Sequence, residues 1–365
     1  MNRLQNLHDA GVSIWLDTLS RELLESGDFA ALVEGSAVTG ATSNPTIFAK
    51  AITGSDRYDD QLGSLVASGV GESRELFFAV ALDDVRRAAA ILRPAYERSA
   101  GRDGFVSFEC TPDVADDTEA TVAQALELWH RLDLPNVLIK VPATPAGVGA
   151  IEELTARGVN VNVTLLFSVE RYEEVIEAYL RGLERRVEAG LPVRGVASVA
   201  SFFVSRIDAK ADAVLAPESA LRGRVAIANA HHAYARYLDR FAGARWEALE
   251  RAGASAQRPL WASTGTKDPS YSDVLYVERL VAPAVINTMP LATLRAFADH
   301  GNAEPTLGPD PSEALGVLSA AAAEGVNLDA ITAELEREGV QAFCDSYAEL
   351  LRCIEGKRSA LTAVS

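Results

Sequence analysis

Cysteine is scarce in this 365-residue chain, and the three that occur, Cys110, Cys344 and Cys353, are widely spaced with no CxxC pair. Such an odd and scattered set favours neither a disulfide framework nor a zinc knuckle, and it is typical of a reducing compartment. The five histidines all fall in expected helices or at their ends, where surface or packing roles are common. We therefore expect no metal site and a cytoplasmic location.

Positive charge and long apolar runs are also in short supply. The chain has 34 basic against 51 acidic residues and a net charge of −17, so its average surface potential repels polyanions. We expect no nucleic-acid partner, and an anionic ligand must meet a locally basic pocket. Apolar stretches such as VASVASFFV are too short to cross a bilayer, and the opening MNRLQNLHDAG lacks the apolar segment of a signal peptide. No membrane association is expected.

Short β-type runs alternate with longer helical patterns along the whole chain. We expect strands at residues 12–17, 38–44, 106–110, 137–143, 159–165, 196–202, 259–264 and 284–289. Eight strand-helix units predict a parallel sheet closed into a (β/α)8 TIM barrel. An open doubly wound sheet is the alternative, but its phosphate fingerprint, GxGxxG directly after the first strand, is missing.

Two intervals are longer than a single helix requires. Residues 45–105 and 203–258 are periodic in apolar residues and rich in Ala, Leu, Glu and Arg, which predicts additional helices after the second and sixth strands. Another helix is expected at the N-terminus. No domain boundary is visible, so residues 1–365 are predicted to form one domain. Helices over about 291–356 should pack on the outside of the barrel, followed by a frayed tail at about 357–365.

A lysine interrupts an apolar strand in NVLIKVPAT. Lys140 could simply extend its amine to water or pair with a carboxylate, so the neighbouring strands must decide. Side chains two apart share a strand face, and a polar residue recurs in phase at the end of every expected strand. These residues are Asp17, Asn44, Glu109, Lys140, Thr164, Ser201, Ser263 and Asn287. In a barrel they meet at the carboxyl-terminal mouth, where catalytic groups gather, although a turn or cap role stays open for the Asn and Ser members.

An amine and two carboxyls at such a mouth indicate covalent chemistry on a carbonyl. A lysine that attacks a ketone forms an iminium, and this cation withdraws electrons from the neighbouring carbon-carbon bond. Asp17 and Glu109 would then carry protons, one at the bond that breaks and one, through water, at the carbinolamine.

Seven motifs, in order, identify a family. WLDTLSRELL, GATSNPTIF, NVLIKVPAT, NVNVTLLFS, SFFVSRID, WASTGTKDP and NTMP resemble the transaldolases of the pentose phosphate pathway, in their bacterial form, over residues 1 to about 355. The resemblance implies a class I aldolase barrel and a transferase. It would move a dihydroxyacetone unit from sedoheptulose 7-phosphate to glyceraldehyde 3-phosphate, giving erythrose 4-phosphate and fructose 6-phosphate. It implies sugar-phosphate substrates and no metal or organic cofactor, and it leaves monomer and homodimer open.

The resemblance also implies roles for individual residues. Lys140 would form the Schiff base, Asp17 would act as acid and base at the sugar hydroxyl, and Glu109 with Thr164 would hold and use the catalytic water. Enamine, hydroxyl and phosphate contacts would come from Asn44, Asn162, Ser201, Arg206 and Ser263. One motif departs from the family pattern: STGTKD replaces a short Ser-Phe-Arg-Asn, so Lys267 takes the place of the second phosphate arginine after a two-residue insertion.

Three other interpretations compete. A fructose 6-phosphate aldolase would release free dihydroxyacetone, but in that branch a tyrosine tends to occupy the place of the substrate-lining Phe203, and the chains are much shorter. A non-catalytic sugar-phosphate-binding barrel would form no covalent adduct with a ketose phosphate. A metal-dependent aldolase or hydrolase would need His and carboxylate ligands at the mouth. For Arg206 itself, an ion pair with Asp208 or another helix acid is the alternative to phosphate binding.

Overall fold

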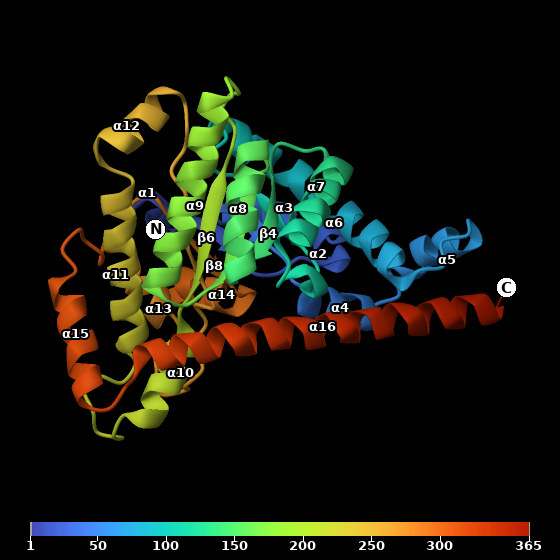
Figure 1. Cartoon of the computed structure of the whole chain (residues 1–365). Coiled ribbons are helices and arrows are strands. Elements are labelled where there is room, and N and C mark those ends of the chain that lie inside the picture. The colour runs from blue at the N-terminus through green and yellow to red at the C-terminus, as the bar shows by residue number, and fades with distance from the viewer. Residues whose placement is uncertain (1, 365) are drawn as a thin grey trace.

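Eight parallel strands close into a barrel in the computed structural model, which describes residues 2–364 (Figure 1). The strands are β1 Val12–Leu16, β2 Val38–Thr42, β3 Val106–Glu109, β4 Val137–Pro142, β5 Val161–Leu166, β6 Ser198–Phe203, β7 Arg258–Ala262 and β8 Val285–Met289. They pair in chain order, and β8 pairs with β1. Each expected run overlaps one strand, so the predicted (β/α)8 barrel is confirmed.

The strands are buried because both faces of the sheet are covered. Every residue of β4 and β5 is buried, as expected for parallel strands with helices outside and packed side chains within. Trp15 fills the amino-terminal half of the interior, where its ring lies 6.4 Å from that of Phe105. A Cβ atom added at Gly40 would lie 2.5 Å from the Trp15 ring. Only glycine fits beside this indole.

Helices connect the strands and surround the barrel (Figure 1). They are α1 Arg3–Asp9, α2 Arg21–Glu25, α3 Asp28–Gly35, α4 Pro45–Thr53, α5 Asp59–Ala67, α6 Ser73–Arg98, η1 Pro112–Val114, α7 Thr118–Leu132, α8 Pro145–Arg157, α9 Val169–Glu188, α10 Ser205–Val214, α11 Val225–Arg240, α12 Gly243–Arg251, α13 Leu275–Glu278, α14 Leu291–His300, α15 Ser312–Ala323 and α16 Leu328–Val364. The additional helices expected at both termini and after the second and sixth strands are present. Within residues 2–364 no single helix has the length and apolarity to cross a membrane. One pair, Ser312–Ala323 with Leu328–Leu361, bent by 91°, meets that test together, by length and composition only.

Cap residues stop the strands and start the next helices at the mouth. The side chain of Thr144 accepts a hydrogen bond from the backbone N–H of Gly147, and Pro145 takes the first position of α8. Asn44 and Pro45 do the same for α4. A capping side chain satisfies a backbone N–H that the helix leaves unpaired, and proline is preformed for that position. The chain therefore turns sharply after these strands, and the last strand residues face the mouth.

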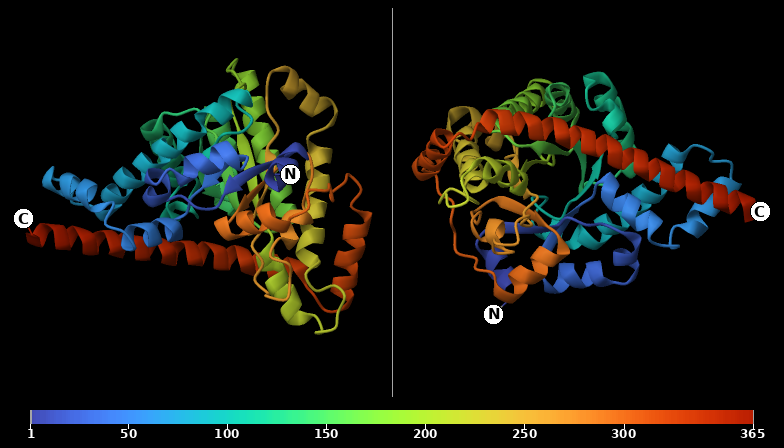
Figure 2. Two further views of the ribbon diagram at one scale, coloured as in Figure 1. Left: turned by 180° about the vertical axis from the view of Figure 1, so that it is seen from behind. Right: turned by 90° about the horizontal axis from the view of Figure 1, so that it is seen from below.

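The course of α16 corrects two expectations. α14 and α15 pack on outer helices as expected, but α16 crosses the carboxyl-terminal end of the barrel, where it contacts α4, η1, α10 and β5 (Figure 2). It also stays helical to Val364 instead of fraying from about residue 357. Lys357 holds this end, because its amine forms an ion pair with Asp59 and donates to the carbonyl of Ser55 at 2.9 Å. Residue 365 of the expected tail lies outside the described residues.

Candidate active site

A buried lysine and a buried carboxyl meet at the mouth of the barrel. Lys140 on β4 and Glu109 on β3 are register partners, and they are 8% and 9% exposed. Nζ of Lys140 lies 3.4 Å from Oε2 of Glu109. Burial raises the pKa of Glu109, and the positive charge of Lys140 opposes this shift. A buried acid this close to an amine can exchange a proton with it.

Asp17 supplies the second carboxyl of the site. It follows β1 directly, and its backbone N–H donates to the carbonyl of Met289 at 2.9 Å. Thr42 Oγ1 donates to its Oδ1 at 3.2 Å. Burial raises the pKa of Asp17, whereas the charge of Lys140 lowers it. Lys140 thus acts on both carboxyls, and the three ionisable groups expected at the strand ends lie together.

A chain of hydrogen bonds crosses the barrel beside Lys140. Asn162 Nδ2 donates to Ser107 Oγ at 2.9 Å, and Ser201 Oγ donates to Asn162 Oδ1 at 2.7 Å. Both ends of the amide are occupied, so its orientation is fixed. Ser107, which lies on the polar face two residues before Glu109, was not among the expected binding residues. Thr164 on β5 is also buried, and its Oγ1 has no hydrogen-bond partner within residues 2–364. A buried hydroxyl of this kind is ready to bind a ligand or water.

Three of the expected strand-end residues have structural partners. Oδ1 of Asn44 accepts a hydrogen bond at 3.0 Å from a backbone N–H of α4. Ser263 has a left-handed backbone, with a φ of 56°, and its Oγ lies 3.0 Å from that of Ser205. Asn287 is 1% exposed, and its Oδ1 accepts from Thr264 Oγ1 at 2.9 Å. Asn287 therefore joins β8 to the loop after β7, whereas Asn44 and Ser263 stay on the partly exposed rim.

Two cationic side chains lie on the rim of the mouth. Arg206 is in the first turn of α10, with its guanidinium carbon 5.2 Å from the centre of the Phe203 ring. Lys267 is exposed in the loop after β7. Both positive charges lower the pKa of Asp17, so both lie within electrostatic reach of the site. Within residues 2–364 neither cation forms an ion pair, and Asp208, the expected alternative partner of Arg206, binds other groups.

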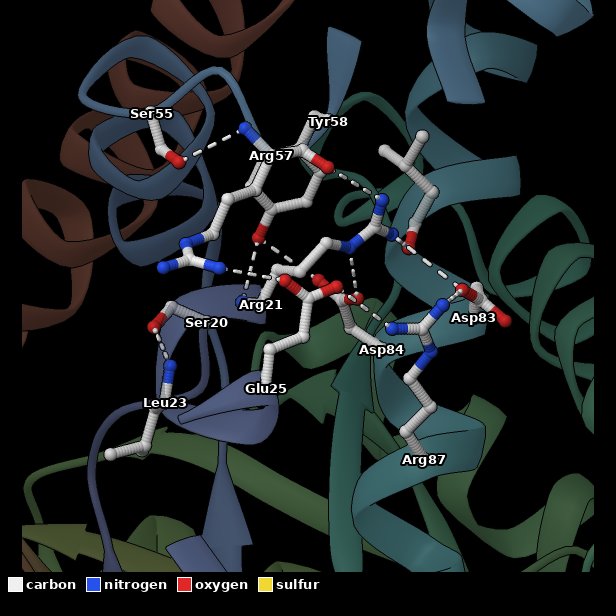
Figure 3. A network of polar contacts seen from close by, with 11 residues as sticks. Ser20, Arg21, Leu23, Glu25, Ser55, Arg57, Tyr58, Asp83, Asp84 and Arg87 are labelled. Atoms are coloured by element: carbon white, nitrogen blue, oxygen red, sulfur yellow. Dashed lines mark hydrogen bonds and ion pairs between the residues drawn. The ribbon is translucent and has the colours of Figure 1, made fainter. Parts of the chain in front are cut away.

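A buried network next to Asp17 was not expected from the sequence. Arg21 is 2% exposed; its Nε donates to Asp84 Oδ1 at 2.9 Å, and its guanidinium stacks on Tyr58, 4.3 Å from the ring centre (Figure 3). The Tyr58 hydroxyl donates to Asp84 Oδ2 at 2.9 Å and accepts from the backbone N–H of Arg21 at 3.0 Å. This network fixes the start of α2, just after Asp17. An arginine inside WLDTLSRELL and the adjacent acids at 83 and 84 were the available signals.

A large cavity lies at the opposite end of the barrel, apart from these groups. It has a volume of about 780 Å³ and lies between the amino ends of the strands and α11 and α12. Two of the charged side chains that line it, Asp103 and Arg258, already bind other groups of the protein. Asp103 accepts a hydrogen bond from Trp15 Nε1 at 2.9 Å, and Arg258 donates to the carbonyls of Ala284 at 3.1 Å and Val285 at 3.0 Å. The chemistry-bearing groups converge at the mouth instead.

The barrel fold and the reactive groups at its mouth together define a class of protein. A (β/α)8 barrel with a buried amine, two carboxyls and rim cations at its carboxyl-terminal end has the arrangement of a barrel enzyme with a lysine nucleophile. Within the part of the chain that the structure describes, no group of three or more His, Cys, Asp or Glu is placed to hold a metal ion.

Comparison with known proteins identifies the family. The model of the family described as Transaldolase/Fructose-6-phosphate aldolase matches residues 14–354. A transaldolase of Frankia alni is 50% identical over 359 residues, which cover 97% of this chain and 96% of the relative. Transaldolase 1 of Streptomyces coelicolor is 50% identical over 357 residues, 96% and 93% of the two chains. A transaldolase of Thermobifida fusca is 49% identical over 365 residues, 98% and 99% of the two chains. The chain belongs to the transaldolase and fructose-6-phosphate aldolase family.

Proposed function

We propose that the protein has transaldolase activity and moves a dihydroxyacetone unit from sedoheptulose 7-phosphate to glyceraldehyde 3-phosphate in the pentose phosphate pathway. The observation that carries this proposal is the position of Lys140, which is buried at the mouth with Glu109 3.4 Å from its amine. Asp17 lies close enough for the lysine charge to lower its pKa. The names of the relatives, about 50% identical over nearly the whole chain, support the same activity.

The first stage joins the ketose to Lys140. The amine adds to the C2 carbonyl carbon and gives up a proton, for which Glu109 is the adjacent base. The carbinolamine then loses its hydroxyl as water, with a proton from Glu109, and the iminium forms. Thr164 has a buried hydroxyl with no hydrogen-bond partner among residues 2–364, so it suits the binding of this water together with Glu109.

The second stage breaks and remakes a carbon-carbon bond. Asp17 accepts the proton of the C4 hydroxyl while the C3–C4 bond breaks, the bond electrons move to the iminium, and the aldose phosphate leaves. The resulting enamine attacks the aldehyde of glyceraldehyde 3-phosphate, and Asp17 returns the proton. Hydrolysis of the new iminium releases fructose 6-phosphate. Burial raises the pKa of Asp17, which suits a group that must hold a proton between the two half-reactions.

Substrate contacts follow from the same geometry. Asn162, whose amide donates to Ser107 and accepts from Ser201, faces the enamine and the sugar hydroxyls together with Ser201. The remaining contacts of the proposal come from Asn44, Phe203, Arg206, Ser263 and Lys267. A guanidinium can bind two phosphate oxygens at once, whereas an ammonium acts as a point charge. We therefore assign the main phosphate contact to Arg206 and a weaker one to Lys267.

Borohydride trapping tests the proposal. Reduction in the presence of fructose 6-phosphate should leave a three-carbon adduct on Lys140, identified by mass spectrometry of a digest. Lys140→Arg keeps the charge but lacks the nucleophilic amine, so it should give no adduct while its circular dichroism spectrum stays native. An adduct on another lysine, or none, would overturn the mechanism.

A lyase that releases free dihydroxyacetone is the second candidate. Both activities share the lysine adduct, so they must be separated by the fate of the enamine. With fructose 6-phosphate alone, a transferase should stop after one turnover at most and should resume when erythrose 4-phosphate is added. Continuous release of dihydroxyacetone without an acceptor would favour the lyase. Phe203, where that branch tends to carry tyrosine, favours transfer.

We also propose that the protein works in the cytoplasm on sugar phosphates, without a nucleic-acid or membrane partner. Its three cysteines are free in the structure, which suits a reducing compartment. The net charge of −17 opposes binding to polyanions. Light scattering combined with size-exclusion chromatography distinguishes monomer from homodimer.

A further inference from the structure

The loop that carries Lys267 is tied to the protein at two points. At its start, Thr264 Oγ1 donates to Asn287 Oδ1 at 2.9 Å and to the carbonyl of Thr288 at 3.2 Å. The next three residues, 265–267, have no hydrogen bond or ion pair to other parts of the described chain. The position of the Lys267 amine therefore depends on the anchor that follows it.

That second anchor is a turn closed by Asp268 and held by Tyr271. Asp268 Oδ1 accepts from the backbone N–H and the hydroxyl of Ser270, at 2.9 and 2.7 Å, and its carbonyl accepts from the Tyr271 N–H at 3.2 Å. The Tyr271 hydroxyl donates to Asp212 Oδ2 at 2.6 Å. The ring of Tyr271 lies against Gly223, where an added Cβ atom would come within 2.9 Å of it and where φ is +68°. Ring and hydroxyl are thus both fixed.

Asp212 is itself immobilised. It is 9% exposed, and its second oxygen, Oδ1, accepts from the backbone N–H of Gly223 at 3.1 Å. It lies in α10, the same helix whose first turn carries Arg206. One helix therefore holds Arg206 through the backbone and the Lys267 loop through a side-chain hydrogen bond.

We propose that Tyr271 and Asp212 are positioning residues that hold Lys267 at the phosphate end of the substrate, at a constant distance from Arg206. This inference rests on the proposed function. Residues 265–267 form no hydrogen bond or ion pair with other parts of the described chain. A loop of this kind loses conformational freedom when its cation binds a phosphate, and an anchor next to that cation removes part of this cost before binding.

The chain offers a matched control one helical turn earlier. Tyr276 donates to Asp208 Oδ2 at 2.9 Å, and Asp208 Oδ1 accepts from the backbone N–H of Ala226 at 2.8 Å. This pair has the same chemistry on the same helix. However, Tyr276 belongs to α13, beyond the loop, and Asp208 is more deeply buried than Asp212, at 1%. Tyr276→Phe therefore removes an equivalent hydrogen bond without releasing Lys267.

The test compares Tyr271→Phe, Tyr276→Phe, Lys267→Ala and the double variant Tyr271→Phe with Lys267→Ala. Steady-state kinetics with fructose 6-phosphate as donor and erythrose 4-phosphate as acceptor give kcat and KM, and unphosphorylated fructose serves as the matched donor. Tyr271→Phe should raise KM for fructose 6-phosphate by about three- to tenfold, the range for one net hydrogen bond, with kcat nearly unchanged. Tyr276→Phe should leave KM unchanged even if it lowers stability more. The double variant should match Lys267→Ala, because a cation that is absent cannot be positioned.

Each other outcome refutes a defined part. If Lys267→Ala raises KM but Tyr271→Phe does not, or if the two effects add fully, the positioning role is wrong and the proposed phosphate contact of Lys267 stands. An equal effect of Tyr276→Phe, or an equal loss with unphosphorylated fructose, would show general destabilisation and would also overturn the inference. If Lys267→Ala leaves KM unchanged, both the inference and that phosphate contact are wrong, whereas trapping of Lys140 still tests the activity itself.

Discussion

Removing the carboxylate of Asp84 should destabilise the fold far more than breaking an ion pair on the surface. Asp84 is 0% and Arg21 is 2% exposed, and the two are joined at 2.9 Å (Figure 3). In Asp84→Ala the guanidinium of Arg21 and the hydroxyl of Tyr58 both lose the carboxylate that they share. An uncompensated buried charge costs about 3–5 kcal/mol. Asp83, 3.6 Å from Arg21 and partly exposed, can replace some of the interaction, so we expect the lower end of this range.

Urea unfolding followed by circular dichroism measures this cost. Glu97→Ala is the control, because Glu97 pairs with Arg93 at 2.8 Å on the exposed face of the same helix, α6, and such pairs contribute about 0.3–0.5 kcal/mol. Arg21→Met combined with Asp84→Leu should be less destabilised than Asp84→Ala, since no charge is left unpaired in the interior. If Asp84→Ala costs no more than Glu97→Ala, the network does not stabilise the start of α2 as we infer.

Three further changes test the site, and a fourth tests the buried carboxyl of Asp208. Asp17→Asn should lower turnover by roughly 10² to 10⁴, the usual contribution of one general acid or base, with a native circular dichroism spectrum; an unfolded spectrum would make Asp17 structural. Glu109→Gln should chiefly slow formation and hydrolysis of the adduct, and unchanged single-turnover trapping rates would contradict that role. Arg206→Ala should raise KM for phosphorylated donors by an amount worth about 2–3 kcal/mol and leave fructose almost unaffected; equal losses on both donors would exclude a phosphate contact. Burial raises the pKa of Asp208 from its ordinary value of 3.8 to about 7. Between these values the folded state binds more protons than the unfolded state, so this carboxyl lowers stability as pH rises. Asp208→Asn should remove a decrease of up to about 4 kcal/mol over that range in urea titrations at several pH values; an unchanged slope would refute the shift.

Local patterns carry the barrel and much of the site. The alternation of strands and helices can be predicted from short stretches of sequence. A parallel strand that is buried on both faces requires a short run of apolar side chains. The in-phase spacing of polar residues has a similar origin. Since a strand's side chains alternate faces, Ser107 and Glu109 must point to the same side. Lys140 and Glu109 then meet because their strands are neighbours in a barrel built in chain order.

The roles of individual polar residues were harder to predict from the sequence. Asn44 and Asn287 look alike at the ends of their strands, yet one caps a helix at the rim and the other binds Thr264 in the interior. An amide can serve a ligand, a cap or a loop equally well. The choice depends on which donors surround it in the folded protein.

Sequence alone determined the eight strands, the face on which the reactive groups lie and the family, because these follow from local periodicity and from motifs in order. The tertiary structure decided what depends on distant partners. In the folded protein Arg21 pairs with Asp84, and Tyr271 donates a hydrogen bond to Asp212. Helix α16 crosses the mouth of the barrel instead of packing along its outside. Hydrophobic periodicity indicates which face of a segment is buried, but it does not indicate which other element packs against that face. Two charged side chains that are distant in the sequence can pair only after folding has brought them together.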